Sequence, residues 1–402
     1  MKNIKWTLNS MTKTNDESLK VMALEEVKKA RGFHKTIPGY EKTPLADLRR
    51  MSEHLGLASI FIKDESYRFG LNAFKVLGGS FSMARYIAKE TGRDVAELDF
   101  DTLTSPQLRE EFGQATFFTA TDGNHGRGVA WAANKLGQKS VVYMPKGSTL
   151  TRLNNIIAEG AKATIEEVNY DECVRMAAAE AAKTPNGVVV QDTAWEGYEE
   201  IPSWIMQGYG TMAMEADEQL AEAGIEAPTH IFVQAGVGSL AGAVQGYFTN
   251  RYPNNPPKVV IVEAEAADCL YKGAVAGDGK ERIVTGDMET IMAGLACGEP
   301  NTISWDILKN HSTAFISLPD WAAAKAMRIL SAPIKGDPQV VSGESGAAGF
   351  AALYSIMTMA ELEPLKTALE LNEQSKVLLF STEGDTDPDR YKEIVWEGKQ
   401  YY

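Results

Sequence analysis

Lys75 stands in an unusual setting for a lysine, within the stretch FGLNAFKVLGGSFSMA. Lysine normally keeps its charge in water, yet its neighbours here include Ala73, Phe74 and Val76, and none of them supplies a carboxylate. Apolar surroundings disfavour an ammonium and lower the pKa of a lysine, as a Schiff-base lysine requires. The alternative is a lysine that snorkels at the start of a helix, and this fragment taken alone favours it.

A glycine-rich turn, in QAGVGSLAGAVQG, follows one predicted strand and opens a predicted helix. Gly236, Gly238 and Gly242 permit tight turns and close approach of the backbone to a ligand. Successive N–H groups at a helix N-terminus then form a nest for a phosphate. The spacing is GxGxxxG instead of GxGxxG, and no acidic residue occupies the ribose-binding position. Both departures weaken the interpretation as a dinucleotide-binding turn. Phosphate binding and a purely structural turn are equally supported at this point.

Two other turns carry acidic and amide side chains, in TATDGNHGRG and VVQD. Asp122 and Asn124 are both suited to capping a helix, so each has a structural alternative. His125 has no partner at metal-ligand spacing, and we interpret it as a packing residue; no metal site is predicted. Asp192 ends a predicted strand at its carboxyl end, where open α/β sheets bind ligands.

The elements that must position these residues alternate between strand and helix patterns. Strand patterns occur at 115–121, 139–145, 161–168, 187–192, 229–235, 258–265 and 376–384. This alternation predicts parallel α/β sheets with helices on both faces. Glu344 and Thr382 lie in two turns that combine Ser or Thr, an acid and Gly, and each turn could be an ordinary capping turn.

Length, charge and cysteine content exclude several classes of protein. A chain of 402 residues suggests two domains. The 54 acidic residues against 40 basic ones give a net charge of -14, which disfavours nucleic acid and anionic membranes as partners. The N-terminal segment does not read as a signal peptide, and no apolar run approaches a membrane span. Cys173, Cys269 and Cys297 form neither a disulfide framework nor a CxxC site, so a cytoplasmic location is expected.

A lysine, a phosphate nest, an asparagine-bearing turn and a hydroxyl-bearing turn together fit a site for pyridoxal 5′-phosphate. The chain resembles the tryptophan synthase β-like family, fold type II, of pyridoxal phosphate enzymes. Within it the chain is similar to the diaminopropionate ammonia-lyases along nearly its whole length. The blocks that carry this resemblance include KDESYRFGLNAFKVLGG, TDGNHGRGVAWAA, YMPKGS, VVQDTAWEGY, IPSWIMQGY, QAGVGSLAG, IMAGLACGEP, SGESGA and STEGDTD.

The resemblance implies a role for each candidate residue. Lys75 would form the Schiff base, Asn124 would contact the ring oxygen, and Thr382 would face the pyridine nitrogen. The implied cofactor-binding residues are Lys75, Phe74, Asn124, Gly236, Val237, Gly238, Ser239, Glu344 and Thr382. The implied catalytic residues are Lys75, Asp122 and Asp192.

The resemblance also implies an α/β fold of two domains, with the active site in the cleft between them. A small domain, residues 80–195, would be inserted into a large cofactor-binding domain formed by 1–79 and 196–402. The implied assembly is a homodimer.

The implied reaction is α,β-elimination of D- and L-2,3-diaminopropionate to pyruvate and two ammonia. Asp192 would bind the β-ammonium of the substrate, and Asp122 would act as a second base for the D-isomer. A serine or threonine dehydratase is the alternative enzyme, although its Ser-x-Gly-Asn-His turn has a small neutral x where this chain has Asp122. The alternative from another class is a non-catalytic sensor of an amino acid or nucleotide.

Overall fold

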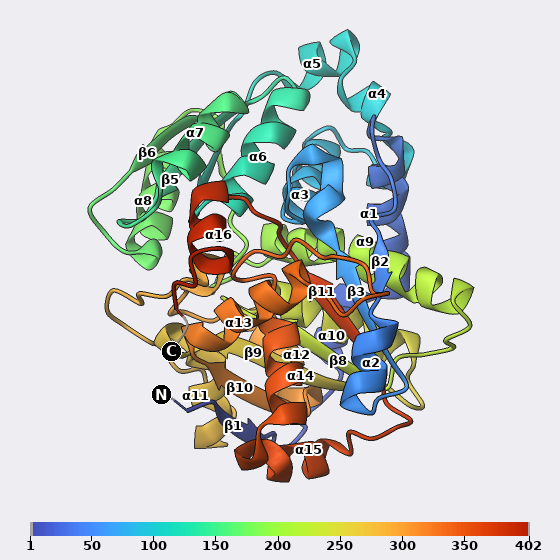
Figure 1. Cartoon of the computed structure of the whole chain (residues 1–402). Coiled ribbons are helices and arrows are strands. Elements are labelled where there is room, and N and C mark those ends of the chain that lie inside the picture. Colours follow the sequence, from blue (N-terminus) through green and yellow to red (C-terminus); the bar gives the residue numbers. More distant parts are fainter. Residues whose placement is uncertain (1–2, 401–402) are drawn as a thin grey trace.

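The computed structural model describes residues 3–400 and contains two β-sheets (Figure 1). The larger sheet, in spatial order, consists of β1 (Lys5–Leu8), β10 (Ala314–Leu318), β9 (Lys258–Ala264), β8 (His230–Gln234), β11 (Lys376–Ser381), β3 (Ser59–Asp64) and β2 (Leu45–Asp47). The smaller sheet consists of β6 (Lys162–Ile165), β5 (Lys139–Met144), β4 (Thr116–Ala120) and β7 (Gly187–Val189). Neighbouring strands are parallel except at the two edges of the larger sheet, where β1 and β2 pair antiparallel.

Helices cover both faces of the larger sheet, and this explains why its central strands read as continuous apolar runs. Successive side chains point to opposite faces: Ile231 and Val233 of β8 join one hydrophobic core, whereas Phe232 joins the other. The first core includes residues of α1 (Leu24–Thr36), α3 (Val76–Glu90), α9 (Glu200–Glu222), α10 (Ser239–Arg251), α11 (Cys269–Ala276) and α12 (Thr302–His311). The second includes residues of α2 (Arg49–Leu55), α13 (Asp320–Ser331), α14 (Ala348–Thr358), α15 (Glu363–Leu369) and α16 (Pro388–Val395).

The smaller sheet forms a lobe of its own, at the upper left of Figure 1. Its helices are α6 (Asn124–Lys135), α7 (Leu150–Ala158) and α8 (Tyr170–Lys183), and the short helices α4 (Phe100–Leu103) and α5 (Pro106–Phe112) precede it. All four of its strands fall inside the predicted inserted segment, 80–195. Helix α3 runs across the first of those boundaries, and the bounds of the two domains stay a prediction.

The predicted class, α/β with parallel-rich sheets flanked by helices, is confirmed. Every predicted strand is present, with ends that differ by a few residues. Four further strands, β1, β2, β3 and β10, were not among those predicted. These four strands form the two outer pairs of the larger sheet. Strands β1 and β10 lie at one edge, and β3 and β2 lie at the other.

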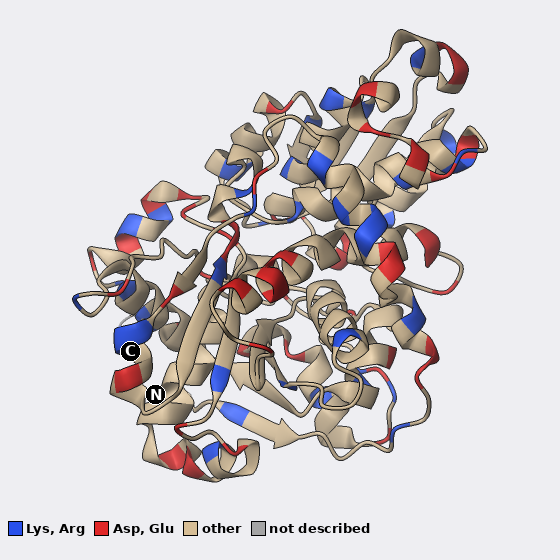
Figure 2. Ribbon diagram, turned by 90° about the vertical axis from the view of Figure 1, so that its right-hand side faces the viewer, with Lys and Arg blue, Asp and Glu red and all other residues tan. Residues whose placement is uncertain are grey.

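Acidic and basic residues are interspersed in the view of Figure 2. Both kinds occur there on helices and loops of the two lobes. Within residues 3–400, no helix has the length and apolar character needed to cross a membrane. Cys269 and Cys297 lie close together as free thiols, with the Cys269 Sγ 3.9 Å from the Cys297 carbonyl oxygen.

Helix α3 packs tightly against its neighbours because glycines stand at the crossings. A Cβ added at Gly208 of α9 would lie 2.4 Å from the Leu77 carbonyl oxygen and 2.9 Å from the Gly78 Cα. A Cβ at Gly128 of α6 would lie 2.8 Å from the backbone nitrogen of Val76. Both obstacles are backbone atoms, which no rotamer change can move. These contacts fix the N-terminus of α3, where Lys75 is located.

We therefore expect Gly208→Ala to lower the free energy of unfolding by about 1–3 kcal/mol, because the added methyl group overpacks the α3–α9 crossing. Gly32→Ala in α1 is the matched control: a Cβ at Gly32 meets no atom within 4 Å. That control should stabilise its helix by roughly 0.5–1 kcal/mol. Thermal unfolding midpoints measured side by side test both, and an unchanged midpoint for Gly208→Ala would contradict the packing argument.

Candidate active site in the cleft between the two sheets

The predicted site residues come together at the carboxyl ends of the strands. One cleft is lined by Phe74, Lys75, Asp122, Asn124, Asp192, Gly236, Val237, Gly238, Ser239 and Thr382, which is every predicted site residue except Glu344. The larger sheet contributes the turns that follow β8 and β11, and the smaller sheet contributes the turns that follow β4 and β7. Ligands bind at this edge in open α/β sheets, and the cleft is therefore the candidate active site.

Lys75 and Asp192 form an ion pair across this cleft. The Lys75 Nζ donates to Asp192 Oδ2, and the Asp192 side chain is only 4% exposed. Two aromatic rings flank the ammonium, with Nζ 5.5 Å from the centroid of Phe74 and 5.8 Å from that of Tyr209. Such distances allow cation–π attraction. The pair joins the N-terminus of α3 to the loop that follows β7.

This ion pair corrects the expected chemistry of Lys75. The sequence predicts surroundings without an acid and therefore a lowered pKa. Burial does act in that direction, but the Asp192 carboxylate outweighs it and holds the pKa of Lys75 above its ordinary value. Burial likewise acts to raise the pKa of Asp192, and the Lys75 charge overcomes it, so that pKa lies well below the ordinary range. Both groups are charged, and the snorkelling alternative for Lys75 is wrong.

Four further side chains surround the Asp192 carboxylate, and one of them, Gln191, donates from Nε2 to Oδ1 at 3.4 Å. Tyr209 donates to Oδ2 and Tyr170 donates to Oδ1, each at 3.4 Å. His125 donates from Nε2 to the Val190 carbonyl oxygen at 2.9 Å, because a carbonyl can only accept. Its Nδ1 lies 3.9 Å from Asp192 Oδ2 and has no hydrogen-bond partner among residues 3–400. Burial lowers the pKa of His125, so a neutral imidazole presents a lone pair toward the cleft.

The turn after β4 is held differently from the expected helix caps. Helix α6 begins at Asn124, its N-cap is Gly123, and no side chain caps it. The hydroxyl of Thr121 accepts from the Gly123 N–H at 2.9 Å, which leaves the acidic side chain of Asp122 for another partner. That partner is Arg152 of α7, whose Nη1 donates to Asp122 Oδ2 at 3.0 Å.

Asn124 reaches across the cleft to the other sheet. Its Nδ2 donates to Glu383 Oε2, and Glu383 Oε1 accepts from the Ser345 N–H at 3.0 Å. Glu383 was not predicted as a site residue, although it follows Thr382 directly in the STEGDTD turn. That adjacency was the one available signal, because sequence gives no indication of which side chain of a turn faces a cleft.

The glycine turn after β8 has the form of an anion nest. Gly238 has a φ of 102°, a left-handed conformation that L side chains rarely adopt, and the 13-residue helix α10 begins at Ser239. A Cβ at Gly238 would lie 2.8 Å from Ser304 Oγ, and one at Gly236 would lie 3.0 Å from the Gly294 carbonyl oxygen. The free N–H groups of a helix N-terminus favour an anion. The phosphate of a pyridoxal cofactor fits this cradle.

Thr382 presents a hydroxyl that suits a pyridine nitrogen. Gln234 Nε2 donates both to the Phe380 carbonyl oxygen and to Thr382 Oγ1, each at 2.9 Å. Since Oγ1 accepts from the amide, its own proton is available to donate to a ring nitrogen. The lysine, the nest and this hydroxyl are the groups that a pyridoxal phosphate needs, and all three line the same cleft.

A fully buried charge network holds the loop that carries Lys75. Arg68 lies in the 3-10 segment η2 (Glu65–Gly70), and its Nη2 lies 2.8 Å from Glu65 Oε1 and 2.8 Å from Glu215 Oε2 of α9. Lys63 of β3 lies 2.8 Å from the same Glu215 oxygen. Buried pairs are tolerated only when every charge has a partner. The network therefore fixes the path of the chain from β3 to α3.

Glu344 is the predicted residue that the structure does not bring to the cleft. Its neighbour Ser345 and the facing Glu383 line the cleft instead. The Glu344 Oε1 lies 3.7 Å from Arg390 Nε and has no hydrogen-bond partner in the described chain. Burial raises the pKa of Glu344 to about 7, opposed by the Arg152 charge and reinforced by Glu383. Glu344 is thus a buried carboxyl that lies behind the cleft and does not line it.

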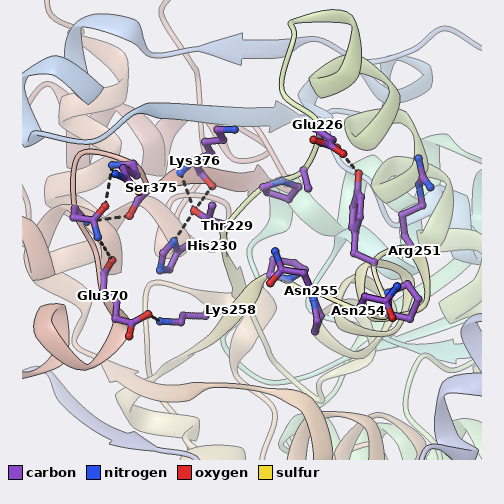
Figure 3. Close-up of a pocket in the computed structure, with 18 residues that line it drawn as sticks. Glu226, Thr229, His230, Arg251, Asn254, Asn255, Lys258, Glu370, Ser375 and Lys376 are labelled. Carbon is purple, nitrogen blue, oxygen red and sulfur yellow. Dashed lines mark hydrogen bonds and ion pairs between the residues drawn. The ribbon is translucent and has the colours of Figure 1, made fainter.

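A larger cavity, about 640 Å³, lies at the opposite edge of the larger sheet. Figure 3 shows the residues around it, which stand where β8, β9 and β11 begin. Its polar groups bind one another: Lys258 pairs with Glu370, and His230 Nε2 donates to the Leu369 carbonyl oxygen at 2.8 Å. Size alone does not make a catalytic site, and the convergent reactive groups are in the cleft.

The raised pKa of Glu344 predicts a pH-dependent effect of Glu344→Gln. The native state favours the protonated carboxyl, so wild-type stability falls as pH rises from the ordinary pKa of 4.5 through about 7. Glutamine resembles the protonated form and avoids that loss. The variant should match wild type near pH 4.5 and exceed it at pH 8 by on the order of 1–3 kcal/mol. Urea unfolding at both pH values measures this, and an equal difference at both would contradict it.

Comparison with known proteins agrees with this site. Residues 36–378 match the family model described as "Pyridoxal-phosphate dependent enzyme". The diaminopropionate ammonia-lyase of Salmonella typhimurium is 55% identical over 368 residues, 91% of each chain. That of Escherichia coli is 48% identical over 386 residues, 96% of this chain and 95% of its own.

A solved structure covers almost the whole chain as well. It is a crystal structure of the Escherichia coli diaminopropionate ammonia lyase in complex with an aminoacrylate-PLP azomethine reaction intermediate. It superposes with a TM-score of 0.89 at 45% identity and covers 99% of this chain and 98% of its own. The family match, the extent of these similarities and the groups gathered in the cleft lead to one conclusion. This chain belongs to the diaminopropionate ammonia-lyase family of pyridoxal-phosphate dependent enzymes.

Proposed function

We propose that this protein catalyses the pyridoxal phosphate-dependent α,β-elimination of 2,3-diaminopropionate, in both enantiomers, with water, to pyruvate and two ammonia. The observation that carries the proposal is the buried Asp192 carboxylate beside the amine of Lys75, in a cleft that also contains a phosphate nest. A serine or threonine dehydratase would need no such charge, because its leaving group is a neutral hydroxyl. The relatives with 48% and 55% identity are named for the proposed activity.

Lys75 is the residue that would carry the cofactor and then move the α-proton at Nζ. When bound, pyridoxal phosphate withdraws electrons from the α-carbon of an amino acid and so acidifies its Cα–H bond. Gly236, Val237, Gly238 and Ser239 would hold the phosphate, and the Thr382 hydroxyl would donate a hydrogen bond to the ring nitrogen. A hydroxyl cannot protonate that nitrogen as a carboxylate would, which favours prompt elimination over transamination.

Phe74 and Asn124 would complete the contacts with the cofactor ring. The Phe74 ring packs on Tyr209 with centroids 4.7 Å apart and lies directly beside Lys75. Asn124 would donate one Nδ2 proton to the ring oxygen, and its second Nδ2 proton can serve Glu383. Glu383 is also anchored by the Ser345 N–H.

Asp192 would bind the β-ammonium of the substrate. An unprotonated amine is a poor leaving group, and a nearby carboxylate keeps it in the ammonium form. The structure supports this role because Asp192 is buried, charged and oriented by Tyr170 and Tyr209. The same carboxylate rejects a hydroxyl at that position, since its buried charge would be left without a partner.

Asp122 would act as the base for the D-isomer. The Cα–H bond must stand perpendicular to the cofactor plane, so the two enantiomers present their protons on opposite faces. Lys75 is tethered on one face and can serve one enantiomer well. Asp122 belongs to the other sheet and lines the same cleft, and it does not cap α6. Its side chain is therefore available for proton transfer.

Two other expectations from the family resemblance are retained as proposals. We propose that the protein acts as a homodimer and in the cytoplasm. Light scattering at several protein concentrations measures the oligomeric state, and cell fractionation measures the location. Neither proposal enters the chemistry described above.

Pyruvate release from D-diaminopropionate, L-diaminopropionate, serine and threonine, assayed side by side, tests the proposed reaction. Both diaminopropionate enantiomers should react faster than serine or threonine. Lys75→Ala should abolish turnover, because no other group of the cleft can carry the cofactor. Mass spectrometry after borohydride reduction should place the cofactor on Lys75. Faster release from threonine would indicate a dehydratase, and a protein that neither binds the cofactor nor turns over any substrate would indicate a sensor.

Asp192→Asn tests how the leaving group is selected. Asparagine keeps the shape and removes the charge, so kcat/KM for diaminopropionate should fall much further than kcat/KM for serine. Loss of one partner of a buried charged contact costs on the order of 2–5 kcal/mol. Cofactor content of the variant, measured by absorbance, is the control for damage to the site. An equal fall for the two substrates would assign Asp192 a structural or general catalytic role instead.

A further inference from the structure

Arg152 of α7 is a buried cation that neither the sequence nor the proposed reaction has accounted for. The residue is 5% exposed, and its Nη1 donates to Asp122 Oδ2 at 3.0 Å. Its aliphatic stem packs on the turn after β4, where a Cβ at Gly123 would lie 3.1 Å from the Arg152 Cδ. The guanidinium is thus fixed against the same turn that carries Asp122.

The position of Arg152 is behind Asp122 relative to the cleft. Arg152 lines an outer cavity of about 630 Å³, which shares Asp122, Tyr170 and Cys297 with the cleft. Arg152 itself is not among the residues that line the cleft. Asp122 therefore lies at the boundary of the two cavities, and the hydrogen bond to Asp122 is the direct contact between Arg152 and a residue that lines the cleft.

The charge of Arg152 is permanent. Burial acts to lower the pKa of Arg152, but the carboxylates of Asp122, Glu383 and Glu344 outweigh it, and the pKa is raised. A guanidinium does not release its proton in proteins, so Arg152 cannot itself take part in proton transfer. What it can do is to hold an anion in one orientation.

Arg152 also constrains Asp122 more than any other group does. Within residues 3–400, the Asp122 carboxylate has no hydrogen bond besides the one from Arg152, which leaves Oδ1 without a partner. An aspartate without this contact would be free to turn about its side-chain bonds. A base has to lie within hydrogen-bond reach of the proton that it takes.

We propose that Arg152 is a positioning residue for Asp122: it binds Oδ2 and so directs Oδ1 to the proton of the D-isomer. This inference rests on the proposed function. It makes Arg152 specific for one enantiomer, because the structure gives Arg152 no contact with Lys75 or Asp192. The L-isomer, served by Lys75, does not depend on it.

The test compares Arg152→Gln and Arg152→Lys, each in the wild-type and the Asp122→Asn background. With the D-isomer, Arg152→Gln should lower kcat by about tenfold to a hundredfold, with a small change in KM, because a displaced base loses rate more than binding. Arg152→Lys retains the charge and should recover part of that loss. With the L-isomer, both variants should stay within about threefold of wild type, since Lys75 is unaffected.

The double variant gives the sharpest criterion. If Arg152 acts through Asp122, Arg152→Gln should cause no further loss of D-isomer turnover once Asp122 is Asn. Arg127→Gln is the matched control: Arg127 of α6 pairs with Glu159 at 3.0 Å and does not contact Asp122. It should affect the two enantiomers alike. Thermal unfolding and cofactor content of every variant show whether the fold is intact.

Two results would overturn the inference. One is an equal loss with both enantiomers on replacing Arg152, and the other is a full additional loss in the Asp122→Asn background. If Arg152→Gln does not fold, Arg152→Lys decides by the same two criteria. Wild-type protein that releases no pyruvate from either enantiomer would instead contradict the proposed function itself, so the two failures are distinguishable.

Discussion

The ion pair between Lys75 and Asp192 is the interaction on which the rest of the site depends. It joins two loops from different sheets, and both charges are largely removed from water. Each ion alone would cost several kcal/mol to bury, and the mutual attraction offsets that cost only with good geometry. The hydroxyls of Tyr170 and Tyr209 supply part of that geometry.

The geometry of the pair depends in turn on the backbone beneath it. Gly128 and Gly208 permit close crossings of α3 with α6 and α9. These crossings fix the position of α3, whose N-cap is Lys75. The buried Arg68 and Glu215 then fix the loop that leads into that helix. Packed interiors resist small displacements. Lys75 is thereby held in place in part by residues, Gly128, Gly208, Arg68 and Glu215, that do not line the cleft.

Four acidic side chains stand in or behind the cleft, and their surroundings separate their roles. Asp192 faces an ammonium, Asp122 faces a guanidinium, and Glu383 accepts from an amide and a backbone N–H. Glu344 is buried, its Oε1 has no hydrogen-bond partner within residues 3–400, and burial raises its pKa to about 7. Sites that carry out proton transfer commonly separate carboxyl groups in this way. Environment, more than residue type, determines which acid binds a cation and which stays neutral.

The fold class and most of the residues that line the cleft could be predicted from the sequence. Alternating strand and helix patterns predicted seven strands of the two sheets, because these patterns depend on local periodicity. The GxGxxxG turn left a phosphate nest and a structural turn equally supported, because glycine permits both. The lysine, the two aspartates and the asparagine were identified by their positions in turns that end strands or begin helices. Parallel strands bring such turns to one edge of a sheet, which explains why these residues line one cleft.

The pairing of those residues could not be predicted from the sequence and follows from the packing of the folded chain. The sequence around Lys75 contains no acid, yet Asp192 reaches it from a position 117 residues away and reverses the direction of its pKa shift. Local rules made Asp122 a helix cap, but Thr121 binds the backbone N–H instead and Arg152 takes the carboxylate. Glu344 and Glu383 could not be distinguished from the sequences of their turns. In the folded chain Glu383 lines the cleft, and Glu344 lies behind it. Electrostatic partners act through space, and no local pattern records them.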